Sequence, residues 1–304
     1  MAARELVVLG TASQSPTRER NHNGYLLRWD GDGILFDPGE GTQRQFTLAG
    51  VSPAATSRIC ITHFHGDHCL GLPGMMMRLA LDGGHPPPIV HYPASGEAYF
   101  RALCSATAGQ ETVPVDARPV SEPGVVHAED TYTLRCESLR HRVDALGWRL
   151  DEEDGWRILP ERLRALGIAG SDIGVLQRAG RIELGGRTVT LPDVSEHRPG
   201  QSVALILDTA WCDGAVELAD GVDLLVAEAT FLTTEAHLAE QYGHLTARQA
   251  GRLAAEGGVR RLVLTHFSPR YQDLQAFVAE AADVYDGEIV LANDLDRISV
   301  PPRR

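Results

Sequence analysis

Three histidines and an aspartate fall within six residues, directly after a short apolar segment of the chain. The segment 58–61 is followed, after one residue, by His63, His65, Asp67 and His68. If a strand opens into a loop here, His63 and His65 project on the same side and the other two groups follow on the turn. Imidazole and carboxylate are ligands that zinc takes in proteins. A structural role can explain one lone histidine but not four such groups at this spacing, so the sequence predicts a metal site.

Three more ionisable residues follow apolar segments far along the chain. They are His141 after 134–139, Asp208 after 203–207 and His266 after 262–265. Each alone could be an ordinary polar strand end. A two-metal site, however, needs six or seven protein groups that converge from one sheet edge. Together with the first cluster, the three residues predict a centre of five histidines and two aspartates, with a bridging Asp208 between ions roughly 3.5–4 Å apart.

The charge composition excludes several classes of function. All 28 basic residues are arginines, which rules out Schiff-base chemistry, a phosphate-loop lysine and a lysine base. The 41 acidic residues and the formal net charge of −13 exclude a basic domain that wraps nucleic acid and a polybasic membrane anchor. The apolar fraction of 43% is typical of a globular protein with a sizeable core.

Neither a secretory signal nor a membrane span is predicted. The N-terminal residues lack a cationic segment and a cleavage site, and no apolar run reaches the roughly 18 residues that a span requires. We therefore expect a cytoplasmic protein without a membrane partner. The five cysteines are widely spaced and form no C-x-x-C pair, which predicts free, buried thiols.

Short apolar runs separated by glycine, proline and polar residues predict many strands and few helices. Several strands are apolar throughout, as expected where helices cover one face of a sheet and a second sheet covers the other. The predicted strands are 5–9, 25–29, 34–36, 58–62, 89–91, 132–138, 146–150, 188–191, 203–208, 224–228, 261–266 and 288–292. The predicted helices are 70–81, 95–106, 247–256 and 274–284. The first of these is apolar almost all round, which places it in the core or at a subunit contact.

Residues 151–199 differ in composition from the rest of the chain. Charge is dense, apolar residues are few and glycine is frequent, which indicates an inserted arm; a plain surface connection is the alternative. Eleven arginines lie from Arg135 to Arg198, whereas residues 199–247 contain none and carry eight acidic residues. Forked guanidinium contacts would let such an arm meet phosphates, although a solvated surface of mixed charge is an equal alternative.

The histidine string and its distant partners resemble the metallo-β-lactamase fold, and other strings resemble the ribonuclease Z family of tRNA 3′-processing endonucleases. This combination spans nearly the whole chain and is more specific than the histidine string alone. The similar strings are Leu9-Gly10-Thr11 with Ser15-Pro16-Thr17-x-x-Arg20-Asn21, then Phe36 to Gln45, His68 to Gly74, Ser138 to Val143 and Thr265 to Tyr271.

The resemblance implies a fold and a domain organisation. The fold is a four-layer αββα sandwich, with two mixed sheets between helices and the metals at the sheet edge. One domain covers 1–304, and the arm at 151–199 is inserted in it as an exosite that binds tRNA. The segment 166–174 departs from the family because it lacks the glycine-proline pair that the arm often carries. A homodimer is also implied, and the helix with methionines 75–77 is compatible with a subunit contact.

The resemblance also implies how the ligands divide between two zinc ions. One ion is held by His63, His65, His141 and Asp208. The other is held by Asp67, His68, Asp208 and His266, and Asp67 is also the proton acceptor. Two such ions can acidify a water molecule and neutralise charge on phosphoryl oxygens, while a carboxylate beside them takes the proton.

A second pair of residues is implied to serve the leaving group. His244 and Glu228 stand where the family has its histidine-serine-threonine and glutamate-alanine-threonine strings. A histidine steadied by a carboxylate is a usual proton donor, so His244 is expected to donate and Glu228 to orient it. The alternative is that residues 244–246 only begin a helix, with Thr246 as its cap.

The implied activity is that of a zinc-dependent endoribonuclease. It removes the 3′ trailer of precursor tRNA and leaves a 3′-hydroxyl on the tRNA and a 5′-phosphate on the trailer. A binuclear zinc hydrolase of small phosphodiesters such as cyclic nucleotides, with the arm as a lid, is the alternative. A non-enzymatic subunit with a structural metal requires lost ligands, and none of the seven is missing. Lactone or β-lactam hydrolysis leaves the strings at 16–21 and 40–43 unexplained.

Overall fold

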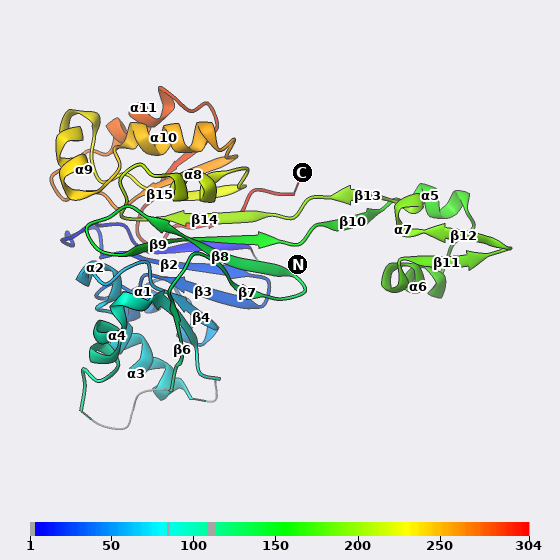
Figure 1. Cartoon of the computed structure of the whole chain (residues 1–304), viewed down its shortest axis with the longest axis horizontal. Coiled ribbons are helices and arrows are strands. Elements are labelled where there is room, and N and C mark those ends of the chain that lie inside the picture. Colours follow the sequence, from blue (N-terminus) through cyan, green and yellow to red (C-terminus); the bar gives the residue numbers. More distant parts are fainter. Residues whose placement is uncertain (1–3, 84–85, 109–113, 304) are drawn as a thin grey trace.

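The chain folds into four layers (Figure 1). The computed structural model describes residues 4–83, 86–108 and 114–303. Two seven-stranded sheets pack face to face, and helices cover the outer face of each. The predicted αββα sandwich is therefore confirmed. Among the described residues, no helix is long and apolar enough to cross a membrane.

The first sheet is mixed and has the order β18-β1-β2-β3-β4-β5-β6. Pairs from β18 to β3 are antiparallel, and pairs from β3 to β6 are parallel. The strands are β1 (Glu5–Gly10), β2 (Gly24–Trp29), β3 (Asp32–Phe36), β4 (Arg58–Cys60), β5 (Ile89–Pro93), β6 (Asp116–Val120) and β18 (Arg297–Ser299).

The second sheet is also mixed and has the order β17-β16-β15-β14-β9-β8-β7. Strands β14 to β17 pair parallel, and the pairs from β14 through β9 and β8 to β7 are antiparallel. The strands are β7 (Gly124–Ala128), β8 (Tyr132–Leu139), β9 (Ala145–Glu152), β14 (Ser202–Ile206), β15 (Leu224–Glu228), β16 (Arg261–Thr265) and β17 (Glu288–Leu291).

Both faces of each sheet are buried, which explains the strands that are apolar throughout. Along β2, Tyr25 and Leu27 face the second sheet, while Leu26 between them packs against the helices. The core between the sheets also holds Trp29 and Trp148.

The helices are α1 (Thr42–Leu48), α2 (Gly66–Cys69), α3 (Leu72–Asp82) and α4 (Glu97–Cys104) over the first sheet, and α8 (Asp213–Ala219), α9 (Ala236–Tyr242), α10 (Ala247–Glu256) and α11 (Gln275–Ala282) on the side of the second. Short 3₁₀ helices cover Pro53–Ala55, Ala94–Gly96 and Thr233–Glu235.

Each predicted strand overlaps an observed one, with ends that agree within two residues. In the two sheets, β6, β7 and β18 were not predicted, because they lie at sheet edges and carry exposed residues that hide the apolar pattern. Of the helices beside the sheets, α1, α8 and α9, each of seven residues, and the four-residue α2 were not predicted. The helix predicted at 70–81 starts at Leu72. It is not buried all round, since Leu81 near its end is 72% exposed. All five cysteines are free, as predicted, and Cys60, Cys69 and Cys136 are buried.

The segment after β9 leaves the sandwich as a narrow arm (Figure 1). Strands β10 and β13 pair antiparallel as its stalk, and β11 and β12 form a hairpin farther out. Although apolar residues are few in this segment, it has a small apolar core of its own around Leu163, Leu176 and Val189. The hairpin turn is Gly185-Gly186, with φ of 57° and 81°, values that glycine adopts without strain. The arm's elements are β10 (Gly155–Ile158), α5 (Pro160–Ala165), α6 (Ser171–Ala179), β11 (Arg181–Leu184), β12 (Arg187–Thr190), α7 (Leu191–Val194) and β13 (Ser195–Arg198).

Candidate metal centre

Strand ends of both sheets meet at the edge of the sandwich that lies opposite the arm (Figure 1). The loop after β4 carries His63 and His65, and α2 carries Asp67 and His68. The second sheet contributes three more residues from directly beyond its strands. These are His141 after β8, Asp208 after β14 and His266 after β16. All seven residues predicted as ligands therefore come from one edge.

Asp208 lies between two groups of ligand atoms. Its Oδ2 is 3.6 Å from Nε2 of His63 and 3.7 Å from Nε2 of His141. Its Oδ1 is 2.9 Å from Nε2 of His266 and 3.3 Å from Nε2 of His68. Three overlapping sets of side chains each have their ligand atoms within 4.8 Å of one another. The sets are His63, His65, His141 and Asp208; Asp67, His68 and His266; and Asp208, His244 and His266.

The donor set fits metal ions. Asp208 Oδ1 and His266 Nε2 are buried, and no described residue gives either atom a hydrogen bond. Buried polar atoms without partners are costly, and a coordinated cation would satisfy both. Asp208 and His266 also adopt positive φ of 35° and 61° directly after their strands. Non-glycine residues in this region carry strain of roughly 1–3 kcal/mol, which is typical of functional sites.

Four ligand histidines turn Nδ1 away from the centre toward an outer partner. Nδ1 of His68 lies 2.7 Å from an Asp37 oxygen, and Nδ1 of His141 lies 2.9 Å from the carbonyl oxygen of Gly243. Because a carbonyl or carboxylate only accepts, these Nδ1 atoms carry the proton. Nδ1 of His63 faces Thr62 Oγ1 at 3.0 Å and Nδ1 of His266 faces Thr230 Oγ1 at 2.7 Å. Nε2 of each ring is then free to bind a metal.

His65 is oriented the other way. Its Nδ1 points into the site, 2.9 Å from Nε2 of His63 and 3.3 Å from Nε2 of His141. Three ring nitrogens and Asp208 Oδ2 thus surround one point, as a tetrahedral zinc site requires. The predicted projection of His63 and His65 to one side agrees with this arrangement.

Asp37 is a supporting residue that the sequence analysis did not single out. Its buried carboxylate accepts hydrogen bonds from the Thr62 amide and hydroxyl, both at 2.7 Å, and from His68 Nδ1. It therefore joins the first-sheet strand end to the ligand loop. Asp37 directly follows β3 at a positive φ of 47°, so the strand-end signal that identified Asp208 was present here too.

Glu228 and His244 form a second buried pair beside the metal ligands. Glu228 is fully buried, and its Oε1 lies 3.0 Å from His244 Nδ1 and accepts the Thr209 amide at 2.6 Å. Oε2 accepts the Thr230 hydroxyl, which in turn faces His266. Thr246 does cap α10, as the alternative held, through a capping box with Gln249. The cap leaves the imidazole of His244 free to point at Glu228.

Neighbouring charges shift the pKa values of these groups. Burial alone would raise the pKa of Asp67, but the neighbouring His68 and His266 hold it below its usual range. Burial alone would likewise raise the pKa of Asp208, yet His266 and His68 hold it well below its usual range. Burial lowers the pKa of His244, but the carboxylates of Glu228 and Asp208 together more than offset this, so that the pKa of His244 is raised. Both aspartates thus stay ionised, while His244 keeps a proton it can donate.

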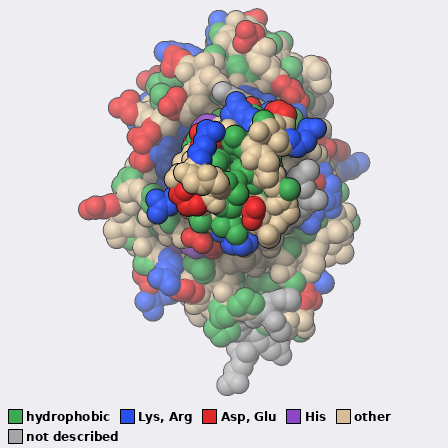
Figure 2. Space-filling model, turned by 90° about the vertical axis from the view of Figure 1, so that its right-hand side faces the viewer, with side chains coloured by type: hydrophobic (Ala, Val, Ile, Leu, Met, Phe, Trp, Pro, Cys, Tyr) green, Lys and Arg blue, Asp and Glu red, His purple; other side chains and the backbone are tan. Residues whose placement is uncertain are grey.

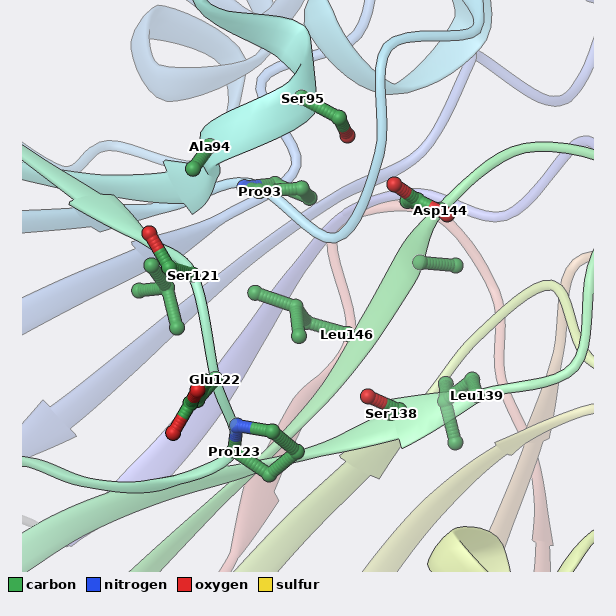
Figure 3. A pocket seen from close by; sticks show the side chains of 12 residues that line it. Pro93, Ala94, Ser95, Ser121, Glu122, Pro123, Ser138, Leu139, Asp144 and Leu146 are labelled. Carbon is green, nitrogen blue, oxygen red and sulfur yellow. The ribbon is translucent and has the colours of Figure 1, made fainter.

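Five of the seven predicted ligands line a pocket of about 580 Å³ that also carries Arg142, Arg270 and Tyr242; they are His65, Asp67, His141, Asp208 and His266. A second pocket, of about 380 Å³, lies between the ends of β5 and β6 and those of β8 and β9 (Figure 3). Glu122 and Asp144 line it, and none of its lining residues is basic. An RNA phosphate would meet only negative charge there. The pocket at the metal ligands is therefore the one suited to a phosphodiester.

Known proteins resemble the chain over its full length. A sequence profile described as the metallo-beta-lactamase superfamily matches residues 17–204. Ribonuclease Z of Nocardia farcinica is 58% identical, with 100% of both chains covered, and Ribonuclease Z of Salinispora arenicola is 54% identical over 100% of this chain and 98% of that protein. The crystal structure of human tRNase Z, short form, shares the fold, with a TM-score of 0.68 at 24% identity over 98% of this chain and 100% of that one. The chain belongs to the ribonuclease Z family of the metallo-β-lactamase superfamily.

Proposed function

We propose that this chain is an endoribonuclease that removes the 3′ trailer of precursor tRNA. It cuts one phosphodiester and leaves a 3′-hydroxyl on the tRNA and a 5′-phosphate on the trailer. One observation carries the proposal: five of the seven predicted ligands line one pocket together with His244, Arg142 and Arg270. The five are His65, Asp67, His141, Asp208 and His266. The full-length similarity to relatives named Ribonuclease Z supports it.

The proposal includes two zinc ions in each subunit. His63, His65, His141 and Asp208 would hold one, and Asp67, His68, Asp208 and His266 would hold the other. The nitrogen and carboxylate donors suit zinc, and Asp208 offers one oxygen to each group. When bound, two zinc ions acidify a water molecule and neutralise charge on phosphoryl oxygens.

The protein's own residues would then orient the reactants and move protons. The Oδ2 atom of Asp67 faces Nε2 of His68 at 3.3 Å and Nε2 of His266 at 3.6 Å, and the side chain lines the pocket. It is placed to orient the attacking water and accept its proton. His244 is placed to protonate the leaving 3′ oxygen, while Glu228 fixes the ring and stabilises its charge.

The arm is the proposed exosite for tRNA. Figure 2 views the molecule from the arm side and shows basic and acidic side chains around an apolar centre. Arg178, Arg181 and Arg187 are exposed, and among the described residues none of them has an acidic partner. Arg157, by contrast, pairs with Glu196. Because the arm leaves the sandwich opposite the metal edge, it would meet a part of the tRNA far from the cleaved bond (Figure 1).

A homodimer is also part of the proposal. The helices over the first sheet expose large apolar side chains, among them Leu48 on α1 at 49%, Leu81 on α3 at 72% and Tyr99 on α4 at 63%. Exposed apolar groups on one layer of the fold are typical of interaction surfaces. Sedimentation velocity tests the idea: we expect a dimer for the wild type and a monomer for Leu81→Asp.

Relative substrate preference tests the proposed reaction. The zinc-loaded protein is offered a tRNA with a 3′ extension, a chromogenic phosphodiester and a cyclic nucleotide, and kcat/KM is compared. We expect precursor tRNA to be preferred by several orders of magnitude over both small diesters. A preference for the cyclic nucleotide would instead support the small-diester hydrolase, in which the arm serves as a lid.

A further inference from the structure

Tyr242 is an aromatic residue of the substrate pocket that no step described so far uses. It ends α9, lines the pocket together with the metal ligands and is 37% exposed. Its hydroxyl takes part in none of the hydrogen bonds between described residues. Phe231, the other aromatic side chain in this pocket, is only 4% exposed and packs at 5.9 Å against His244. Tyr242 therefore offers the accessible ring of the pocket.

An arginine lies beside this ring. The guanidinium of Arg142 is 5.9 Å from the centre of the Tyr242 ring, and its side chain is exposed. Among the described residues, Arg142 forms no ion pair and no side-chain hydrogen bond, although Arg270, the second arginine of the pocket, bonds Ser268 Oγ at 3.1 Å. An exposed ring next to an unpaired guanidinium suits a nucleotide, since the ring can stack on a base and the cation can bind a phosphate.

The backbone holds Tyr242 at a fixed place beside the reacting groups. Gly243 follows it with a positive φ of 74°, and its carbonyl oxygen accepts the hydrogen bond from His141 Nδ1. A Cβ added at Gly243 would lie 3.2 Å from that same nitrogen. The positive φ therefore favours glycine, and a larger residue would also press on His141. Tyr242 thus directly precedes the residue whose carbonyl oxygen contacts His141, and it lies two residues before His244.

The position of His244 identifies the nucleotide concerned. In the proposed reaction the leaving oxygen is the 3′ oxygen of the last nucleotide of the tRNA, and His244 protonates it. The base nearest to His244 belongs to that nucleotide. We propose that Tyr242 and Arg142 form a nucleotide-binding subsite, in which the Tyr242 ring stacks on the base next to the leaving oxygen and Arg142 binds a phosphate that flanks the cleaved one. This inference rests on the proposed function.

Substrates with and without that base test the stacking contact. One precursor tRNA carries the natural base at the last tRNA nucleotide, and a matched one is abasic there. We expect Tyr242→Ala to lower kcat/KM on the natural substrate roughly tenfold, as is typical for the loss of one base–aromatic stack. The kcat/KM of the wild type should be lower by the same factor on the abasic substrate. On that substrate, Tyr242→Ala should lower kcat/KM by less than a further twofold. Tyr242→Phe should behave as the wild type on both.

Three outcomes are distinguishable. An equal loss for Tyr242→Ala on both substrates overturns the stacking role, because a merely structural contact does not depend on the base. A loss in Tyr242→Phe as large as in Tyr242→Ala overturns it as well. Failure of the zinc-loaded wild type to cut either RNA contradicts the proposed function itself. Zinc content, measured by plasma mass spectrometry, confirms that each variant keeps an intact metal centre.

The salt dependence of RNA binding tests Arg142. Catalytically blocked protein, with Asp67→Ala in every sample, is titrated with precursor tRNA at several salt concentrations. Arg142→Ala should lower the slope of log K against log salt by about 0.7–1, which corresponds to one lost phosphate contact. Arg118→Ala is the matched control, since Arg118 is an exposed arginine on β6 outside the pocket. If Arg142→Ala leaves the slope unchanged, Arg142 does not bind a phosphate of the RNA.

Discussion

The buried carboxylate of Glu228 lies 3.0 Å from Nδ1 of His244 and holds that ring against the metal ligands. Through Thr230 the same carboxylate also reaches His266, so one acidic group orients both the proposed proton donor and a ligand histidine. The proton donor and the metal centre therefore share one support.

Replacement of His244 should slow only reactions whose leaving group needs a proton. We expect His244→Ala to lower kcat on precursor tRNA by about 10²–10⁴-fold, the usual contribution of a general acid. A diester with a p-nitrophenolate leaving group needs no proton, so its rate should fall far less. Comparing the two substrates in steady-state assays makes the test. Equal losses on both would show that His244 acts on the metal centre instead.

Asp208→Asn should lower the metal content. Both ligand groups depend on this carboxylate, one through each oxygen, and an amide offers only one good oxygen donor. We expect the zinc content after dialysis to fall from two ions per chain to one or none. Asp144→Asn, at the acidic pocket, is the control that should keep both ions. Two retained ions in Asp208→Asn would contradict the bridging role.

Asp37→Asn should weaken metal binding without removing a ligand. Asp37 accepts a hydrogen bond from Nδ1 of His68 and another from the hydroxyl of Thr62, the residue before His63. Loss of such an outer partner typically costs 10–100-fold in metal affinity. Competition with a chelator measures the change. An affinity equal to that of the wild type would show that the His68 ring is oriented by other contacts.

Arg178, Arg181 and Arg187, which have no acidic partner among the described residues, should govern the salt dependence of tRNA binding. Replacement of Arg178, Arg181 and Arg187 by alanine should reduce the log–log salt slope by roughly two to three and raise KM for precursor tRNA. Arg252→Ala on α10 is a surface control outside the arm. A small diester cannot reach the arm, so the variant should hydrolyse it at a rate within twofold of the wild-type rate. An unchanged slope would mean that the arm's mixed-charge surface is only solvated.

Glu152 should make stability depend on pH. Arg4 and Arg303 form ion pairs with it, and although burial opposes them, these contacts lower its pKa to about 2. A depressed pKa contributes stability above the unfolded value of 4.5, which is lost as pH falls toward 2. Glu152→Gln should therefore lower Tm by a few degrees at pH 7, and the difference should shrink below pH 4.5. A constant difference in Tm from pH 7 to 3 would contradict this linkage.

The strand ends explain how much of the site could be predicted from the sequence. Asp208 and His266 follow the largely apolar strands β14 and β16, so their position could be inferred before their contacts were known. Tyr242 and Gly243 could not, because their role depends on α9, a seven-residue helix too short for its period to stand out. In the arm, only the second strand of the hairpin was predicted, at 188–191, because both strands of the hairpin are only four residues long. Long apolar strands were thus predictable, and short polar elements were not.

The most direct test of the proposed function is to map the cut in a precursor tRNA. Zinc-loaded wild type and Asp67→Ala are incubated with an RNA that carries a 3′ trailer, and the position and chemistry of the new ends are determined by sequencing and phosphatase sensitivity. We predict one cut after the acceptor stem by the wild type, with a 3′-hydroxyl on the tRNA and a 5′-phosphate on the trailer, and no cut by folded Asp67→Ala. Scattered cuts, a 3′-phosphate end, or full activity of Asp67→Ala would contradict the account.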